Sequence, residues 1–226
     1  MVDLSFEVSG VEAEPFSVSP LLIFRLRIVN RTPRVRIRNV MLGCQIRIEP
    51  TRRAYRAEER ERLLELFGPP ERWAHSLRSF VFAHASIGAP AFDEEISVRL
   101  PIACTHDHAA ASAKYFSGLV EGAAPLLLLF SGSVFFTDES GGLRIEQIPW
   151  SKEVAFALPL SVWERLMTAH YGDGDFIRLG ARTLERLRRY QRREALLAID
   201  DAVARLLDAT EREPEGSQSS VTEAAP

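Results

Sequence analysis

The sequence predicts an α+β fold that is mainly β: an antiparallel β-sandwich with inserted short helices and a C-terminal helical extension. Three observations support this fold class. Seven or eight short segments are rich in apolar residues, most of them alternating with polar ones, and turn residues separate them. Two stretches, residues 57–67 and 109–119, have a helical composition instead. A charged segment with an imperfect apolar stripe, residues 182–210, follows the last predicted strand.

Alternation defines the strands in the first hundred residues. It is clearest in residues 22–29, where the even-numbered positions are apolar and Arg25 and Arg27 lie between them. A period of two places the apolar side chains toward the core and the arginines toward solvent. The strands predicted in this half are residues 4–11, 22–29, 35–48, 77–86 and 95–102.

The second half begins with the most apolar segment of the chain, residues 125–136. Its continuous apolar character predicts a strand that is buried on both faces. Residues 137–142 contain Asp, Ser and two glycines, which indicates a hairpin turn into a strand at 143–148. A last strand is predicted at 154–158, and a helix at 161–170.

These elements predict the domain organisation. Residues 1–175 form the β-sandwich domain with its inserted helices, and residues 176–210 form a C-terminal helix packed on it or extending from it. Residues 211–226 are polar and acidic, which predicts a disordered tail. The C-terminal helix is also a candidate surface for pairing with a second copy of the chain.

Composition limits the class of protein. A hydrophobic share of 46% and a charged share of 26% are those of a globular protein. No apolar run reaches the length of about 18 residues that a membrane helix needs, and the N-terminus has no export signal. Cys44 and Cys104 are therefore expected to be free thiols in a reducing compartment, and the protein is expected to be cytoplasmic.

The net charge of −3 hides an uneven distribution, because residues 21–60 contain eleven arginines and three acidic residues. If the arginine-bearing strands are neighbours, one sheet face is strongly positive and could receive an acidic protein, an anionic lipid face or nucleic acid. We rank first the ordinary alternative, in which each arginine covers apolar surface and pairs with a nearby glutamate. Nucleic acid ranks last, because no aromatic residues are interleaved for stacking. The candidate interface residues are Arg25, Arg27, Arg36, Arg38, Arg47 and Trp150, the last at a predicted strand end.

A possible metal site is the second candidate. In an extended strand, Cys104, His106 and His108 point to the same side and offer a thiol and two imidazoles, which are ligands that zinc accepts. The alternative is that Asp107 caps the helix that follows, which would turn His108 away. No nucleophile elbow, phosphate-binding loop or dinucleotide glycine pattern is present, so we expect neither an enzyme nor a bound cofactor.

Several motifs resemble an uncharacterised family, a domain of unknown function found in actinobacterial-type proteins. The resemblance extends from about Leu4 to Tyr190. The motifs that carry it are Cys44-Gln-Ile-Arg-Ile-Glu-Pro50, Arg52-Arg-Ala-Tyr55, Leu66-Phe-Gly68, Arg72-Trp73, Ala113-Lys-Tyr-Phe116, Pro125-Leu-Leu-Leu-Leu-Phe-Ser-Gly132, Pro149-Trp-Ser-Lys-Glu153, Leu158-Pro159 and Val162-Trp163.

Members of this family are often encoded beside nickel–iron hydrogenase genes. The resemblance therefore implies a non-enzymatic accessory protein that assembles or stabilises such an enzyme by binding a hydrogenase subunit or a maturation factor. A metal-handling protein for nickel, zinc or iron, which would use Cys104, His106 and His108, is the alternative function. The resemblance supplies no site residues.

Overall fold

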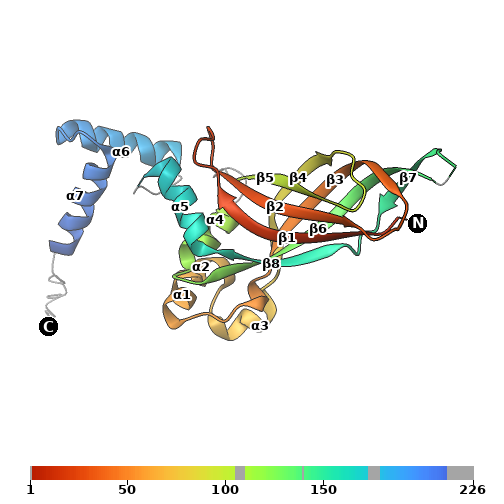
Figure 1. Cartoon of the computed structure of the whole chain (residues 1–226). Coiled ribbons are helices and arrows are strands. Elements are labelled where there is room, and N and C mark those ends of the chain that lie inside the picture. Colours follow the sequence, from red (N-terminus) through yellow and green to blue (C-terminus); the bar gives the residue numbers. More distant parts are fainter. Residues whose placement is uncertain (1, 105–109, 139, 173–178, 213–226) are drawn as a thin grey trace, which may run out of the picture. The chain divides into compact units, whose positions relative to one another are not determined.

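The structure is a computed structural model that describes residues 2–104, 110–138, 140–172 and 179–212. The chain divides into two compact units, with the boundary between residues 174 and 175, and each unit is described by itself. The predicted fold class is confirmed: the protein is mixed α+β, with most of its strands in two antiparallel sheets and with C-terminal helices (Figure 1).

The smaller sheet has three strands in the order β1-β2-β5, formed by Leu4–Ala13, Leu21–Asn30 and Glu95–Ala103. Both strand pairs are antiparallel. On β2 the alternation of the sequence becomes an alternation of burial, because Phe24 and Leu26 are buried whereas Arg25 is exposed. The period of two thus places the apolar face of this strand in the core.

The larger sheet has five strands and is centred on β3 and β6, formed by Arg36–Ile48 and Ala123–Thr137. One long edge of β6 pairs with β3. Along its other edge, residues 123–129 pair with β8 and residues 132–137 pair with β7, so this one long strand has two short neighbours on that side. The remaining strands of this sheet are β4 (Phe80–Ala89), β7 (Leu143–Ile148) and β8 (Glu153–Pro159).

The prediction that residues 125–136 form a strand buried on both faces is wrong. Leu126 and Leu128 of β6 are fully buried, but Leu127 and Leu129 on its other face are only half-buried. The apolar run arises because the outer face is also apolar there, not because a second layer covers it. The segment is therefore a one-sided strand of an antiparallel sheet.

Aromatic side chains join the two sheets across a single core. The rings of Phe6 on β1 and Phe130 on β6 stack at 4.5 Å between centroids. Phe24 on β2 meets Phe156 on β8 edge to face at 5.6 Å. These contacts between strands of different sheets show that the sheets face each other as the two layers of a sandwich.

Short helices are inserted between strands. Helices α1 (Ala57–Arg62), α2 (Leu64–Phe67) and α3 (Trp73–Ser76) lie between β3 and β4, and α4 (Ala110–Gly118) lies between β5 and β6. The single helix predicted at 57–67 is instead two, α1 and α2, which meet at the fully buried Leu63. Helix α5 (Leu160–Tyr171) follows β8 directly.

The second unit contains α6 (Ala181–Arg193) and α7 (Ile199–Arg212), which pack against each other. The single C-terminal helix predicted over 176–210 is therefore wrong. The chain turns at Ala195, whose φ of 53° lies in the left-handed region, and the Gln191 side chain donates hydrogen bonds to the carbonyls of Leu196 and Leu197. The tail predicted at 211–226 lies, from residue 213 on, outside the described residues.

Candidate binding site

The arginines singled out in the sequence do not form one surface. Arg25 and Arg27 lie on β2, in the three-stranded sheet, whereas Arg36, Arg38 and Arg47 lie on β3, in the five-stranded sheet. The two strands are not paired, and the apolar side chains of both sheets meet in the core between them. The arginines therefore point away from each other on opposite layers, and the expectation of a single positive face is corrected.

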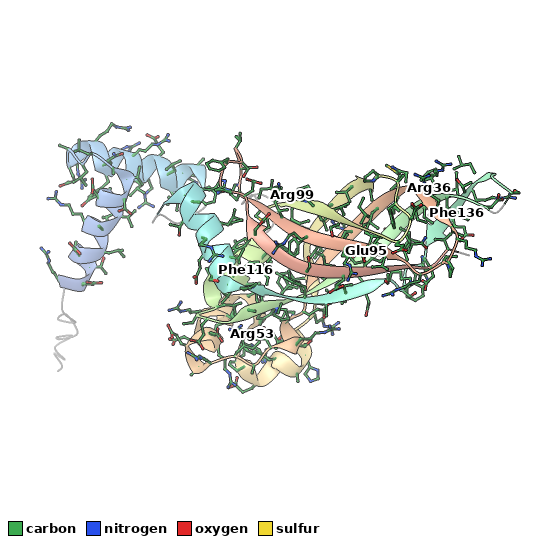
Figure 2. All side chains as sticks on the ribbon, in the orientation of Figure 1. Arg36, Arg53, Glu95, Arg99, Phe116 and Phe136 are labelled. Carbon is green, nitrogen blue, oxygen red and sulfur yellow. The ribbon has the colours of Figure 1, made fainter. Side chains whose placement is uncertain are left out.

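Local partners also occupy most of these arginines. Arg27 forms ion pairs with Glu7 and Glu95 on the two neighbouring strands. Arg36 lies 3.5 Å from Asp93. Arg38 donates a hydrogen bond to Thr137, and Arg47 donates one to Ser79. Figure 2 shows Arg36 near Phe136 at one end of the sandwich and Arg99 toward the other, so the basic side chains are dispersed along it.

Trp150 lies in the turn between β7 and β8 and is 88% exposed. The neighbouring Lys152 forms an ion pair with Asp3 at 2.6 Å, which places this turn beside the beginning of β1. An exposed tryptophan of this kind remains a candidate contact residue.

Of the three predicted metal ligands, the structure describes only Cys104. Cys104 is buried, and its thiol lies 3.5 Å from the carbonyl oxygen of Ile102. Burial raises the pKa of the Cys104 thiol to about 12, and the pKa of Cys44 to about 12 as well, so both are held as neutral thiols. His106 and His108 lie outside the described residues. Within the described part of the chain, no three His, Cys, Asp or Glu side chains are grouped to hold a metal ion.

A groove of about 730 Å³ lies where the end of β1 meets α5, and sequence analysis did not predict it. Its lining comes from residues 11–15 on one side and from residues 161–169 on the other. The β1–β2 loop and α5 lie at the same end of the sandwich (Figure 1). The apolar residues that line the groove are Val11, Ala13, Pro15, Leu166 and Ala169.

The charged residues of this groove are mainly acidic. Glu12, Glu14 and Glu164 line it together with a single cation, Arg165. Arg99 on β5 reaches Glu14 at 2.6 Å and Glu12 at 3.9 Å. The groove therefore combines apolar walls with a surplus of carboxylates, which suits an apolar segment that carries basic residues.

The loop beside the groove presents two apolar side chains to solvent. Phe16 is 94% exposed, and Val18 is fully exposed. Ser17, which lies between them, anchors the loop to α5. Its hydroxyl forms a hydrogen bond with the ring of His170 at 3.3 Å. The amide of Glu14 also donates to the carbonyl of Leu21 across the loop. An exposed aromatic ring held on an anchored loop is typical of a binding surface.

One signal in the sequence points to this loop. Residues 15–20 read Pro-Phe-Ser-Val-Ser-Pro, so apolar residues at 16 and 18 lie between two prolines, where a solvated turn would carry polar residues. The segment lies between the strands predicted at 4–11 and 22–29.

Comparison with known proteins places the chain in a family. The model of DUF6084 matches residues 1–215. The chain belongs to this family of unknown function. No curated protein matches it in sequence.

Several of the motifs named above meet near the inserted helices. The ring of Trp73 lies 5.2 Å from that of Tyr55, and the hydroxyl of Tyr55 lies 3.0 Å from that of Tyr115.

Two solved structures are distantly similar. One is the crystal structure of the putative ApaA protein from Bordetella pertussis, with 12% identity and a TM-score of 0.27; the match covers 70% of this chain and 95% of that one. The other is the X-ray structure of a Northeast Structural Genomics Consortium target, with 10% identity and a TM-score of 0.21; it covers 70% of this chain and 85% of that one. Scores this low carry no argument about fold or function.

No helix of the described residues is long and apolar enough to cross a membrane.

Proposed function

We propose that this protein is a non-enzymatic binding protein that receives a segment of a partner protein in the groove between β1 and α5. The observation that carries the proposal is the apolar groove beside the anchored loop, where Phe16 and Val18 are exposed. An apolar cleft next to an exposed aromatic residue combines the two features that concentrate binding energy in protein interfaces.

The charges of the groove indicate the chemistry of the bound segment. Glu164 lines the groove and has no ion pair with any residue that the structure describes, whereas Glu12 and Glu14 share Arg99. A segment with apolar residues for the groove walls and a lysine or arginine for Glu164 is the best fit.

The class of partner rests on the resemblance rather than on the groove. The resemblance implies a family encoded beside nickel–iron hydrogenase genes, so the partner that we propose is a hydrogenase subunit or a factor that matures the enzyme. In this proposal the protein assembles or stabilises the enzyme by holding one of its segments.

We expect the double substitution Phe16→Ser/Val18→Ser to lower recovery of the partner by about tenfold or more, because removing apolar anchors from an interface costs more than about 1.4 kcal/mol. The measurement is affinity purification of the full chain from its own host, with quantitative mass spectrometry of the proteins that accompany it.

The matched control is Leu143→Ser/Ile145→Ser, which removes two exposed apolar side chains from β7 instead. Recovery of hydrogenase or maturation proteins with the control but not with the Phe16→Ser/Val18→Ser variant supports the proposal. Equal recovery with both variants would remove the loop beside the groove from the account, and partners unrelated to hydrogenase would remove the proposed class of partner.

A further inference from the structure

Strand β7 forms one edge of the five-stranded sheet, because it pairs with β6 on one side only. The β6–β7 hairpin lies at the end of the sandwich away from α5 (Figure 1). Within the described part of the chain, no backbone-to-backbone hydrogen bond reaches the outer side of β7. An open edge of this kind presents N–H and C=O groups that another strand can bind.

The register of the hairpin shows which backbone groups lie on this open edge. The amide of Asp138 donates to the carbonyl of Gly142, and from that pair onward every second residue of the strand bonds to β6. Arg144 and Glu146 therefore direct their backbone groups to β6. The residues that direct theirs outward are Leu143, Ile145 and Gln147.

The open edge also carries apolar side chains that are exposed to solvent. Leu143 is 65% exposed and Ile145 is 57% exposed. Ile145 lies opposite the half-buried Phe135 of β6. Edge strands are commonly protected by proline or by a bulge, but β7 contains no proline and pairs with β6 without a register shift. A strand bound at this edge would cover both apolar side chains.

The charges of β7 favour one way of pairing this strand with a second copy of itself. If two β7 strands pair antiparallel about Ile145, Arg144 of each copy lies opposite Glu146 of the other. Centring the pair on Arg144 would place two arginines opposite each other, and centring it on Glu146 would place two glutamates there. The register centred on Ile145 is thus the one of these three in which opposite charges meet.

The existing contacts of the two charged side chains are compatible with this pairing. Of the described residues, only Asp138 bonds to the Arg144 side chain, and it does so through Nε at 2.8 Å. The two Nη groups of the guanidinium can therefore donate to a carboxylate of the second copy. Glu146 accepts a hydrogen bond from the Val2 amide at 2.7 Å, and a carboxylate can accept several hydrogen bonds at once.

We propose that two copies of this chain join their five-stranded sheets through β7, antiparallel about Ile145. Ile145 then forms a hydrogen-bonded pair with Ile145 of the second copy, and Leu143 forms one with Gln147. A two-fold axis makes each of these contacts symmetric, so the assembly closes as a dimer. The inference does not depend on the proposed function of the groove, which lies at the other end of β1.

Sedimentation velocity of the full chain over a range of concentrations tests the association. We expect a mass twice the 25.4 kDa of one copy, with half association on the order of 10 µM, because one short strand makes a smaller contact than a standard interface. Ile145→Lys should raise this concentration by about tenfold or more, since it places two lysines opposite each other. The matched control is Met41→Lys, which changes an exposed apolar residue on the central strand β3 and should leave association unchanged.

Cysteine substitutions test the register separately. The Cα atoms of a hydrogen-bonded pair lie about 5.5 Å apart, which is within the range of a disulfide. Ile145→Cys should therefore form a disulfide-linked dimer under mild oxidation. Leu143→Cys is the control, because residue 143 is at least as exposed but would lie about 14 Å along the strand from its own copy. It should form the linked dimer at least about tenfold more slowly. The native Cys44 and Cys104 are buried.

A chain that stays monomeric at every concentration would overturn the proposal. Association of the Ile145→Lys protein equal to that of the Met41→Lys protein would overturn it as well, and so would linkage through position 143 as fast as through position 145. Circular dichroism checks that each variant keeps its fold. The Leu143→Ser/Ile145→Ser protein should be monomeric and still recover the partner of the groove, so the two proposals fail separately.

Discussion

Replacing Arg53 with methionine is expected to lower the free energy of unfolding by about 3–5 kcal/mol, because it leaves a buried carboxylate without its counter-charge. Glu59 on α1 is fully buried and forms an ion pair with Arg53. The Glu59 carboxylate also accepts hydrogen bonds from the backbone amides of Val120 and Arg56. Arg53 in turn donates to the carbonyls of Glu121 and Ala123, so this one pair ties α1 to the segment that enters β6.

The matched control is Arg56→Met. Arg56 also forms an ion pair with a glutamate, Glu121, but both side chains of that pair are 60% exposed. Exposed pairs contribute between 0 and about 1 kcal/mol, so urea unfolding should separate the two variants clearly. Equal losses of stability would contradict the assignment of Glu59 and Arg53 as a buried structural pair. The double variant Arg53→Met/Glu59→Leu should recover part of the loss, because it removes both charges.

The same pair gives an acid dependence of stability. Burial alone would raise the pKa of Glu59, but the hydrogen bonds from Val120 and Arg56 and the contact with Arg53 outweigh it and lower the pKa below its ordinary value. The unfolded state then binds this proton more readily than the folded state. The contribution is therefore present above the ordinary pKa of a glutamate and is lost as the pH falls through the lowered value. Glu59→Gln should flatten this part of the acid unfolding curve.

Gly132→Ala is expected to lower the free energy of unfolding by about 4 kcal/mol or more, a loss typical of backbone strain combined with a clash in the core of a sheet. Gly132 lies in β6 with a φ of 132°, a conformation that other residues rarely adopt. A Cβ atom there would lie 2.0 Å from the carbonyl oxygen of Met41 on β3. The backbone of one of the two central strands would have to move.

Gly88→Ala is the control for Gly132, because both glycines neighbour Met41 in the sheet. A Cβ at Gly88 meets no atom nearer than the Met41 sulfur, at 4.0 Å. The change should alter stability by less than about 1 kcal/mol. Thermal unfolding of both variants decides the matter, and a Gly132→Ala protein as stable as the Gly88→Ala protein would show that the β3–β6 contact has been placed wrongly.

The strands could be predicted from the sequence because alternation is a local property. Residues 22–29 alternate, and β2 buries the even-numbered positions. Alternation says which side of a strand is apolar, but not which strand lies next to it. The turn at residues 30–33 is compatible with a hairpin, yet the chain crosses there to the opposite sheet, and Arg34 adopts a φ of 63°. The predicted arginine face fails for this reason.

The helical elements show the limits of local signals in another way. Residues 182–210 have helical composition throughout, and the turn at Ala195 contains neither glycine nor proline. Its hydrogen bonds come from the Gln191 side chain, which donates to the carbonyls of Leu196 and Leu197, and from the Leu196 amide, which donates to the Gln191 carbonyl. The amino-acid composition of the segment does not predict such a turn.

The groove could not be predicted because its two sides lie about 150 residues apart in the sequence. Only the fold brings residues 11–15 against α5. The one local signal was the pair of apolar residues, Phe16 and Val18, between two prolines. This signal indicates a binding surface only once the apolar groove beside it is known.

The central claim is that a partner protein binds at the loop of Phe16, and photocrosslinking in the native host tests it most directly. A photoreactive benzoylphenylalanine replaces Phe16 in one full-length protein and Trp150 in another. Both positions are exposed, but the turn of Trp150 lies beside the beginning of β1 whereas the groove lies at its end, about 30 Å away. The account predicts a covalent adduct with a hydrogenase subunit or maturation protein from position 16, whether or not position 150 also forms one. An adduct from position 150 alone, or none from position 16, would contradict it.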